Sequence, residues 1–129
     1  MKKLNVLIVE DNKINALVLS KSIQSLCVSK HVINDKEAFK AVEEEDFDLI
    51  FMDINLGSNS LDGEAIMKRV KAMPQHADMK ILAVTSYAMP GDRQRFLDAG
   101  FDAYFPKPIN KQAILAGVQE IFGSSQIAV

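Results

Sequence analysis

The sequence has a single cysteine, no long hydrophobic run and almost no net charge. A helix that crosses a bilayer needs about 20 consecutive apolar residues. The apolar runs here extend over only a handful of residues, so we expect no membrane segment and no export signal. The lone Cys27 cannot form an intrachain disulfide, and between Leu26 and Val28 it is typical of a small buried hydrophobe. A reducing, cytoplasmic setting fits these features.

Charge of one sign is also lacking, because 15 Lys and Arg side chains nearly balance 17 Asp and Glu side chains. Proteins that bind DNA, RNA or an anionic membrane surface usually carry a basic excess. We therefore expect no direct nucleic-acid or membrane partner for a chain with a net charge of -2. The 129 residues, 48% hydrophobic and 25% charged, predict one globular domain that spans residues 1–129.

Short apolar runs alternate along the chain with longer stretches of helical periodicity. This alternation is typical of repeated strand–helix units around a parallel sheet. The expected strands are residues 4–9, 28–33, 49–52, 81–84 and 103–105. The expected helices are residues 14–26, 36–44, 64–72, 92–99 and 111–122. The fold class is therefore α/β, with a five-stranded parallel sheet.

Polar side chains follow four of the expected strands at the point where each strand ends. They are Glu10 and Asp11, then Asp53, then Thr85 and Ser86, and finally Lys107. Ligands of open parallel sheets bind beyond the carboxyl ends of the strands, so these groups are expected to share one crevice. Taken alone, Asp11 would suggest a helix cap and Lys107 a solvated surface lysine. The joint pattern favours a functional site.

Three carboxylates in one crevice repel one another, and a divalent cation relieves that repulsion. Oxygen ligands of this kind favour Mg²⁺ over zinc. A phosphoryl group at Asp53 would have its charge balanced by the cation and by Lys107, with the Thr85 hydroxyl as a further donor. An ionised aspartate can itself be the nucleophile, which gives an aspartyl phosphate. The residues thus indicate phosphoryl chemistry with Mg²⁺ as the cofactor.

These residues resemble the motifs of the receiver domains of two-component response regulators. The motifs lie at residues 8–12, 47–53, 62–63, 84–86 and 104–108, so the resemblance covers nearly the whole chain. Residues 87–93 are similar in particular to stand-alone receivers and to receivers attached to hybrid histidine kinases. The resemblance implies a flavodoxin-like three-layer sandwich with strand order 2-1-3-4-5. It also implies a signalling switch of a two-component or phosphorelay system rather than an enzyme.

The resemblance assigns a role to each residue of the expected crevice. It implies that Asp53 accepts a phosphoryl group from the phosphohistidine of a histidine kinase or a histidine phosphotransfer protein. Thr85 and Lys107 then bind the phosphoryl oxygens. The implied Mg²⁺ ligands are the carboxylates of Glu10, Asp11 and Asp53 and the backbone carbonyl of Asn55.

The resemblance also implies a conformational switch. Thr85 moves toward the phosphoryl group, and the aromatic side chain of Tyr104 turns inward. The Lys107–Pro108 bond is expected to be cis, an isomer that only X-Pro bonds adopt readily. A downstream effector protein would read the face formed by the fourth helix, the fifth strand and the fifth helix.

Two features depart from the common receiver pattern. The loop after Asp53 has Gly57 where a proline is usual, and residues 58–61 hold about two residues more than the common form. We expect this loop to be more mobile. The first acid is Glu10 where many receivers have Asp, and its longer arm can still reach a metal through water.

Two other functions compete with the switch. A phosphohydrolase of the haloacid dehalogenase type also combines a nucleophilic Asp, Mg²⁺, a hydroxyl and a Lys. Members of that class have the pattern Asp-x-Asp at the nucleophile, whereas this chain has Asn55 two residues after Asp53. A receiver-like module that no longer takes phosphate would be favoured by the loss of Asp53, Thr85 or Lys107, and all three are present. His31 and His76 stand apart from the acids, so we expect no histidine metal site.

The first expected helix carries two sets of apolar residues. Its buried stripe is predicted to contain Ala16, Leu19, Ile23 and Leu26. Ile14 and Val18 fall roughly opposite this stripe and are expected to be exposed. Single exposed apolar side chains are normal in proteins. The resemblance favours a docking role instead, since receivers commonly bind the phosphohistidine partner through this helix and the loop after the Lys, here around Pro108.

Overall fold

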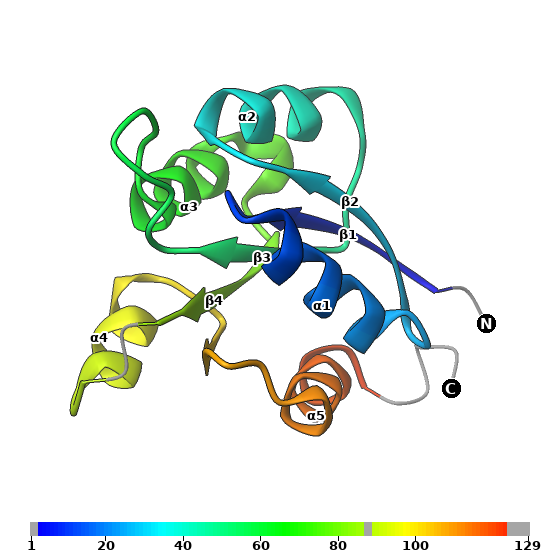
Figure 1. Cartoon of the computed structure of the whole chain (residues 1–129). Coiled ribbons are helices and arrows are strands. Elements are labelled where there is room, and N and C mark those ends of the chain that lie inside the picture. The colour runs from blue at the N-terminus through cyan, green and yellow to red at the C-terminus, as the bar shows by residue number, and fades with distance from the viewer. Residues whose placement is uncertain (1–2, 87–88, 124–129) are drawn as a thin grey trace.

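The computed structural model describes residues 3–86 and 89–123, which form a parallel sheet between two layers of helices (Figure 1). The strand order is β2-β1-β3-β4-β5, and every neighbouring pair is parallel. The strands are β1 Leu4–Val9, β2 Cys27–Val32, β3 Leu49–Asp53, β4 Lys80–Thr85 and β5 Ala103–Pro106. The predicted α/β class and strand order are confirmed.

Five α-helices connect and follow the strands. They are α1 Lys13–Ile23, α2 Asp35–Glu44, α3 Gly63–Ala72, α4 Asp92–Ala99 and α5 Lys111–Phe122, and a short 3₁₀ helix, η1, covers Pro74–His76. Helices α1 and α5 cover one face of the sheet, and α2, α3 and α4 cover the other (Figure 1). Within the described ranges, no helix combines the length and the apolar character that a bilayer crossing requires.

Alternate residues of each central strand feed two separate cores. On β3, Ile50 and Met52 pack in the core beneath α2, α3 and α4, whereas Leu49 and Phe51 pack in the core beneath α1 and α5. Helices on both faces keep β3 buried along its whole length. This explains why the sequence at β3 is a continuous apolar run rather than an alternating one.

Four helices begin at a side chain that accepts a hydrogen bond from the backbone N–H three residues later: Asn12, Asn34, Asp62 and Asn110. These caps satisfy backbone donors that have no partner within the helix. Asn12, and not Asp11, therefore caps α1. The carboxylate of Asp11 is left for other chemistry.

Helix α1 is shorter than its periodicity predicts and ends at Ile23 instead of residue 26. The Leu26 N–H donates to the Ile23 carbonyl in a turn, and the Leu26 carbonyl accepts from the Leu4 N–H at the start of the β1–β2 pairing. Leu26 is buried all the same, so a turn residue mimics the helical stripe. Strand β2 correspondingly starts at Cys27, one residue earlier than predicted, and Cys27 is buried as expected.

Close packing of α5 on β5 depends on a glycine. A Cβ atom at Gly117 would lie 2.5 Å from Cζ and 3.1 Å from Cε1 of Phe105. Such a contact is far shorter than van der Waals packing allows, so the ring and an alanine cannot both keep their positions. The glycine therefore lets the Phe105 ring lie directly against the helix.

We predict that Gly117→Ala lowers the free energy of unfolding by about 1–3 kcal/mol, although alanine is the better helix former by about 1 kcal/mol. Urea unfolding measures the change. The double variant Gly117→Ala, Phe105→Leu should lose less unfolding free energy than the sum of the two single variants. Leucine lacks the ring tip that the new Cβ atom would contact. A stabilised Gly117→Ala variant would show that the ring moves aside at no cost.

Candidate functional site

The register of the sheet brings the predicted site residues to one edge. Val9 pairs with Met52, Asp53 with Val84, and Thr85 with Pro106, so these four strands end at nearly the same level. The Lys107 N–H donates to the Thr85 carbonyl at 2.8 Å, which extends the pairing by one residue. A cavity of about 310 Å³ opens at this edge, and its lining includes Glu10, Asp11, Asp53, Asn55, Thr85, Ser86 and Lys107. The crevice predicted from the strand ends is present.

Three carboxylates converge in this crevice. Glu10, Asp11 and Asp53 each offer an oxygen, and these oxygens lie within 4.8 Å of one another. Glu10 and Asp53 are buried, whereas Asp11 is exposed at the rim. An all-oxygen set of this kind suits a hard divalent cation such as Mg²⁺ better than zinc. The residues present therefore fit a metal site.

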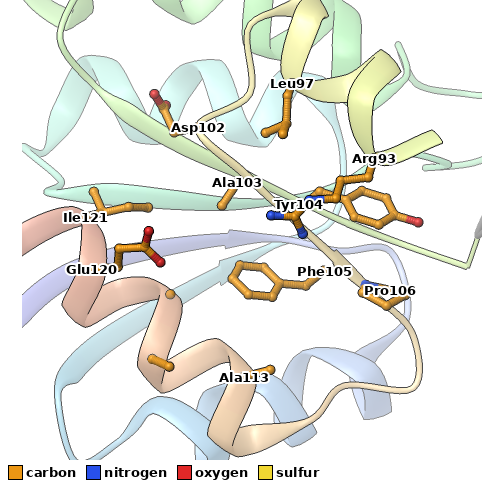
Figure 2. Close-up of a pocket in the computed structure, with 12 residues that line it drawn as sticks. Arg93, Leu97, Asp102, Ala103, Tyr104, Phe105, Pro106, Ala113, Glu120 and Ile121 are labelled. Atoms are coloured by element: carbon orange, nitrogen blue, oxygen red, sulfur yellow. The ribbon is translucent and has the colours of Figure 1, made fainter. Parts of the chain in front are cut away.

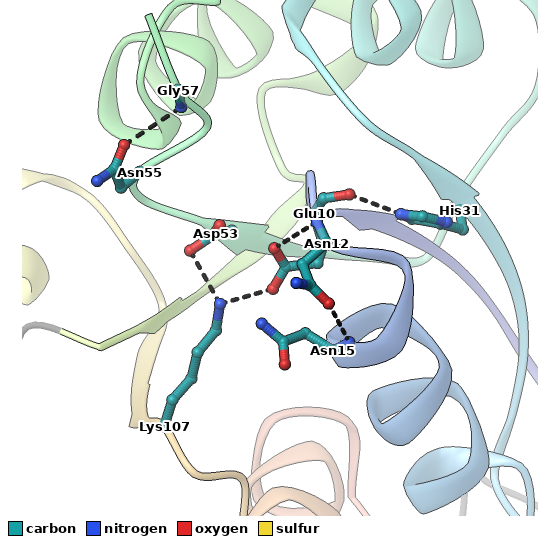
Figure 3. Close-up of polar contacts among 8 residues, drawn as sticks. All are labelled: Glu10, Asn12, Asn15, His31, Asp53, Asn55, Gly57 and Lys107. Atoms are coloured by element: carbon teal, nitrogen blue, oxygen red, sulfur yellow. Dashed lines mark hydrogen bonds and ion pairs between the residues drawn. The ribbon is translucent and has the colours of Figure 1, made fainter.

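The Lys107 ammonium group links two of these acids (Figure 3). Its Nζ atom donates to Glu10 Oε1 at 2.6 Å and to Asp53 Oδ1 at 3.3 Å. Glu10 Oε2 also accepts from the Asn12 backbone N–H at 3.2 Å. The longer side chain of Glu10 thus bridges the start of α1 and the lysine after β5.

Burial and charge shift the pKa values of all three acids. Burial and the negative charge of Glu10 raise the pKa of Asp53 to about 7, although Lys107 opposes the shift. Burial also acts to raise the pKa of Glu10, but its hydrogen bonds from Lys107 and Asn12 outweigh burial and hold that pKa below its usual value. Partial burial and the neighbouring Glu10 raise the pKa of Asp11. Without a cation the crevice therefore holds more negative charge than Lys107 neutralises.

The loop after β3 shows why Gly57 replaces the usual proline. Gly57 has a φ of +89°, and its N–H donates to Asn55 Oδ1 at 3.2 Å. Proline fixes φ near −65° and has no N–H, so it meets neither requirement. The far end of the loop is tied to α2, because Asp35 accepts from the Leu61 N–H and the Asp35 N–H donates to Ser60 Oγ. The expected mobility of this loop stays a prediction.

Gly63 has a role in the site that the sequence pattern did not assign. A Cβ atom there would lie 2.2 Å from the backbone oxygen of Asp53 and 2.8 Å from Cγ of Met52. The start of α3 therefore presses directly against the end of β3. The Asp62–Gly63 pair caps the helix through Asp62 and leaves room for the Asp53 backbone through Gly63.

His31 is a second residue that the sequence did not connect with the acids. It pairs with Ile8 across β1 and β2, and its Nε2 donates to the Glu10 carbonyl at 2.6 Å (Figure 3). This bond holds the backbone at the point where β1 leads into the acidic pair. His76 instead donates to the Val42 carbonyl, away from the crevice. The sequence pattern of helices and strands does not predict either histidine contact.

The residues expected to switch lie on the neighbouring strands β4 and β5. Thr85 is buried at the end of β4, and Tyr104 is buried on β5 with its ring stacked on Phe96 at 5.8 Å. Beyond Tyr104, a surface cavity of about 570 Å³ lies between α4, β5 and α5 (Figure 2). The cavity lies on the face that was expected to serve as the readout.

The residues expected to dock a partner lie on the α1 side. Ile14 is 72% exposed and Val18 is 48% exposed, as predicted, and Leu17 between them is also exposed. Pro108 is exposed, and the Lys107–Pro108 bond is cis, as predicted. The helix therefore presents an apolar stripe to solvent next to the crevice.

Comparison with known proteins identifies similar sequences. A family model described as "Response regulator receiver domain" matches residues 6–119. The chain is 31% identical to the polar-differentiation response regulator DivK of Brucella anthropi, over 94% of this chain and 98% of DivK. It is 32% identical to hybrid signal transduction histidine kinase G of Dictyostelium discoideum, over 84% of this chain. It spans only 3% of that kinase, and 14% of a Myxococcus xanthus gliding motility regulatory protein with 35% identity.

Solved structures show the same fold. The receiver domain of a sensor histidine kinase from Pseudomonas aeruginosa superimposes with a TM-score of 0.82 at 30% identity, over 95% of this chain and 100% of that domain. That structure has a magnesium ion coordinated in its active-site cleft. A protein of the same fold therefore binds magnesium in its active-site cleft.

We predict that Asp53→Asn stabilises the metal-free protein. An aspartate with a higher pKa in the folded than in the unfolded state binds more protons when folded, so the wild type loses stability as the pH rises from about 4 to about 7. Asparagine carries no charge to lose. The variant should match the wild type near pH 4 and exceed it by about 2 kcal/mol at pH 8, after allowance for solvent screening.

Urea unfolding with a chelator present, at pH 4 and at pH 8, measures this difference. The exposed Asp78 provides a matched control, because Asp78→Asn removes a carboxylate that lies outside the crevice. Equal stability of Asp53→Asn and wild type at pH 8 would mean that Lys107 fully compensates the Asp53 charge.

Proposed function

The chain belongs to the response regulator receiver domain family, and on that premise we propose that Asp53 takes a phosphoryl group from a phosphohistidine partner. The observation that carries the proposal is the buried Asp53 carboxylate with Lys107 Nζ 3.3 Å away. The crevice around this pair is lined by further acids and by Thr85. Phosphorylation then changes the conformation of the domain, which acts as a switch and not as an enzyme for a separate substrate.

The transfer is a displacement at phosphorus. A carboxylate oxygen of Asp53 attacks as the P–N bond to the donor imidazole breaks, and the electron pair of that bond stays on the ring nitrogen. The Lys107 ammonium offsets the negative charge of the phosphoryl oxygens, and the Thr85 hydroxyl donates to one of them.

The proposed cation is Mg²⁺, held by the carboxylates of Glu10, Asp11 and Asp53 and by the backbone carbonyl of Asn55. The close approach of the three carboxylates supports this assignment. When bound, Mg²⁺ supplies the positive charge that keeps Asp53 ionised and that balances the phosphoryl oxygens. Glu10 at the same time orients Lys107 through their 2.6 Å contact.

The switch works through contacts that exist in only one of two states. Thr85 and Lys107 contact a phosphoryl group in only one of the two states, and a ligand shifts a conformational equilibrium only through such differences. Tyr104 pairs with Ala83, two residues before Thr85, which supports a path from the phosphoryl group to β5. An effector protein would bind the surface between α4, β5 and α5 (Figure 2).

The proposed phosphohistidine partner docks on the exposed stripe of Ile14 and Val18 and on Pro108. This stripe belongs to the same helix whose first turn lines the crevice, so a partner bound there holds its donor close to Asp53.

The proposed location is the cytoplasm. Cys27 is a free, buried thiol, which fits a reducing compartment and supports this location.

With Mg²⁺ and acetyl phosphate, we predict that the protein gains one acid-stable, base-labile phosphoryl group at Asp53, because the nucleophile and its charge-balancing groups are present. Intact mass before and after incubation measures the gain. Asp53→Asn should gain none, and the exposed Asp78→Asn should gain the same group as the wild type. A label that persists in Asp53→Asn would reject the assignment.

For the docking stripe, we predict that Ile14→Asp or Val18→Asp slows transfer from a phosphorylated histidine phosphotransfer domain at least about tenfold relative to transfer from acetyl phosphate. The loss corresponds to about 1.4 kcal/mol of transition-state binding, since a charge replaces an apolar contact. Val28 is the matched control, because it is also an exposed valine but lies on β2. An equal effect of Val28→Asp would mean that added charge, and not the stripe, is responsible.

A further inference from the structure

Asn15 lies in the first turn of α1 and lines the same crevice as Asp53 and Lys107. Its side chain is half-buried and extends from α1 into the crevice (Figure 3). Its backbone N–H donates to Asn12 Oδ1, but within the described residues its side-chain amide makes no hydrogen bond. The Asn15 amide at the mouth of the crevice can therefore bind a ligand.

The other amide side chains at the mouth already have partners. Asn12 uses its Oδ1 atom to cap α1, and Asn55 uses its Oδ1 atom to accept from the Gly57 N–H. Both oxygens hold backbone in place. Among these three, Asn15 is therefore the amide whose carbonyl oxygen has no partner within the described residues and can accept a hydrogen bond from an incoming molecule.

The position of Asn15 matches the path of the donor. Asp53 is buried at the floor of the crevice, and in a displacement at phosphorus the leaving group lies opposite the attacking oxygen, so it points toward the mouth. The exposed residues Ile14 and Val18 flank Asn15 on the same helix. A donor held against that stripe brings its leaving group past the Asn15 amide.

We propose that Asn15 determines phosphodonor specificity by accepting, through Oδ1, the ring N–H of the donor's imidazole. The inference rests on the proposed phosphorylation of Asp53. As the Asp53 oxygen bonds to phosphorus, the P–N bond breaks and its electron pair stays on the ring nitrogen that carried the phosphorus. The other ring nitrogen keeps its proton, so a donor protonated there leaves as neutral imidazole. Asn15 orients this ring, whereas an acyl phosphate has no N–H to offer.

Two small donors test the proposal without a partner protein. Labelling rates of Asp53 are measured by intact mass with N-phosphoimidazole and with acetyl phosphate, in Mg²⁺ buffer, and the ratio of the two rates is compared among variants. Asn15→Leu should lower the ratio of the N-phosphoimidazole rate to the acetyl phosphate rate about fivefold, or about 1 kcal/mol. Asn15→Asp should keep the ratio within about twofold of wild type, because a carboxylate oxygen still accepts an N–H.

The control is Lys21→Leu, which places the same new side chain on an exposed position of α1 away from the crevice, and its ratio should equal that of wild type. An unchanged ratio in Asn15→Leu overturns the inference. An equal loss of the ratio in Asn15→Leu and Asn15→Asp also overturns it, because it means that the amide acts as a donor. Failure of both donors to label wild-type Asp53 would instead reject the proposed function.

Discussion

The ammonium group of Lys107 is the contact on which the site depends, because it lies between two buried carboxylates. It donates to Glu10 at 2.6 Å and to Asp53 at 3.3 Å, and both acids are buried. Charges that are buried without a partner are costly, so the lysine is what allows these acids to sit at the end of the sheet. Its own position follows from the register of β4 and β5, since the Lys107 N–H donates to the Thr85 carbonyl.

One ammonium group does not balance three carboxylates. Burial, together with the excess negative charge, raises the pKa of Asp53 to about 7, which leaves this carboxyl partly protonated at neutral pH when no cation is bound. The free energy of unfolding of the metal-free protein is thus lower than it would be with a neutral side chain at Asp53. Functional sites commonly reduce stability in this way. The same imbalance favours binding of a cation, and the cation favours the ionised nucleophile. The need for charge balance therefore links the stability of the fold, metal binding and the proposed phosphorylation.

The sequence predicted the fold and most of the crevice because both depend on local patterns. Apolar runs identify the strands, and the polar residue that follows each run lies at the same sheet edge in any parallel sheet. Gly63 and His31 could not be assigned this way, since each acts through a contact with a distant segment: Gly63 with the Asp53 backbone, and His31 with the Glu10 carbonyl. The predicted end of α1 is wrong for a similar reason, because Leu26 is buried in the turn that leads into β2 and not on the helix.

Burial and the crowding of carboxylates together make the ionisation of Asp53 depend on a cation. The most direct measurement is the pKa of the Asp53 side-chain carboxyl, obtained by ¹³C NMR titration of labelled protein with a chelator and again with saturating Mg²⁺. We predict a pKa of about 7 without metal and a pKa lower by at least about one unit with Mg²⁺. A pKa near that of an exposed aspartate without metal, or one that Mg²⁺ leaves unchanged, would contradict it.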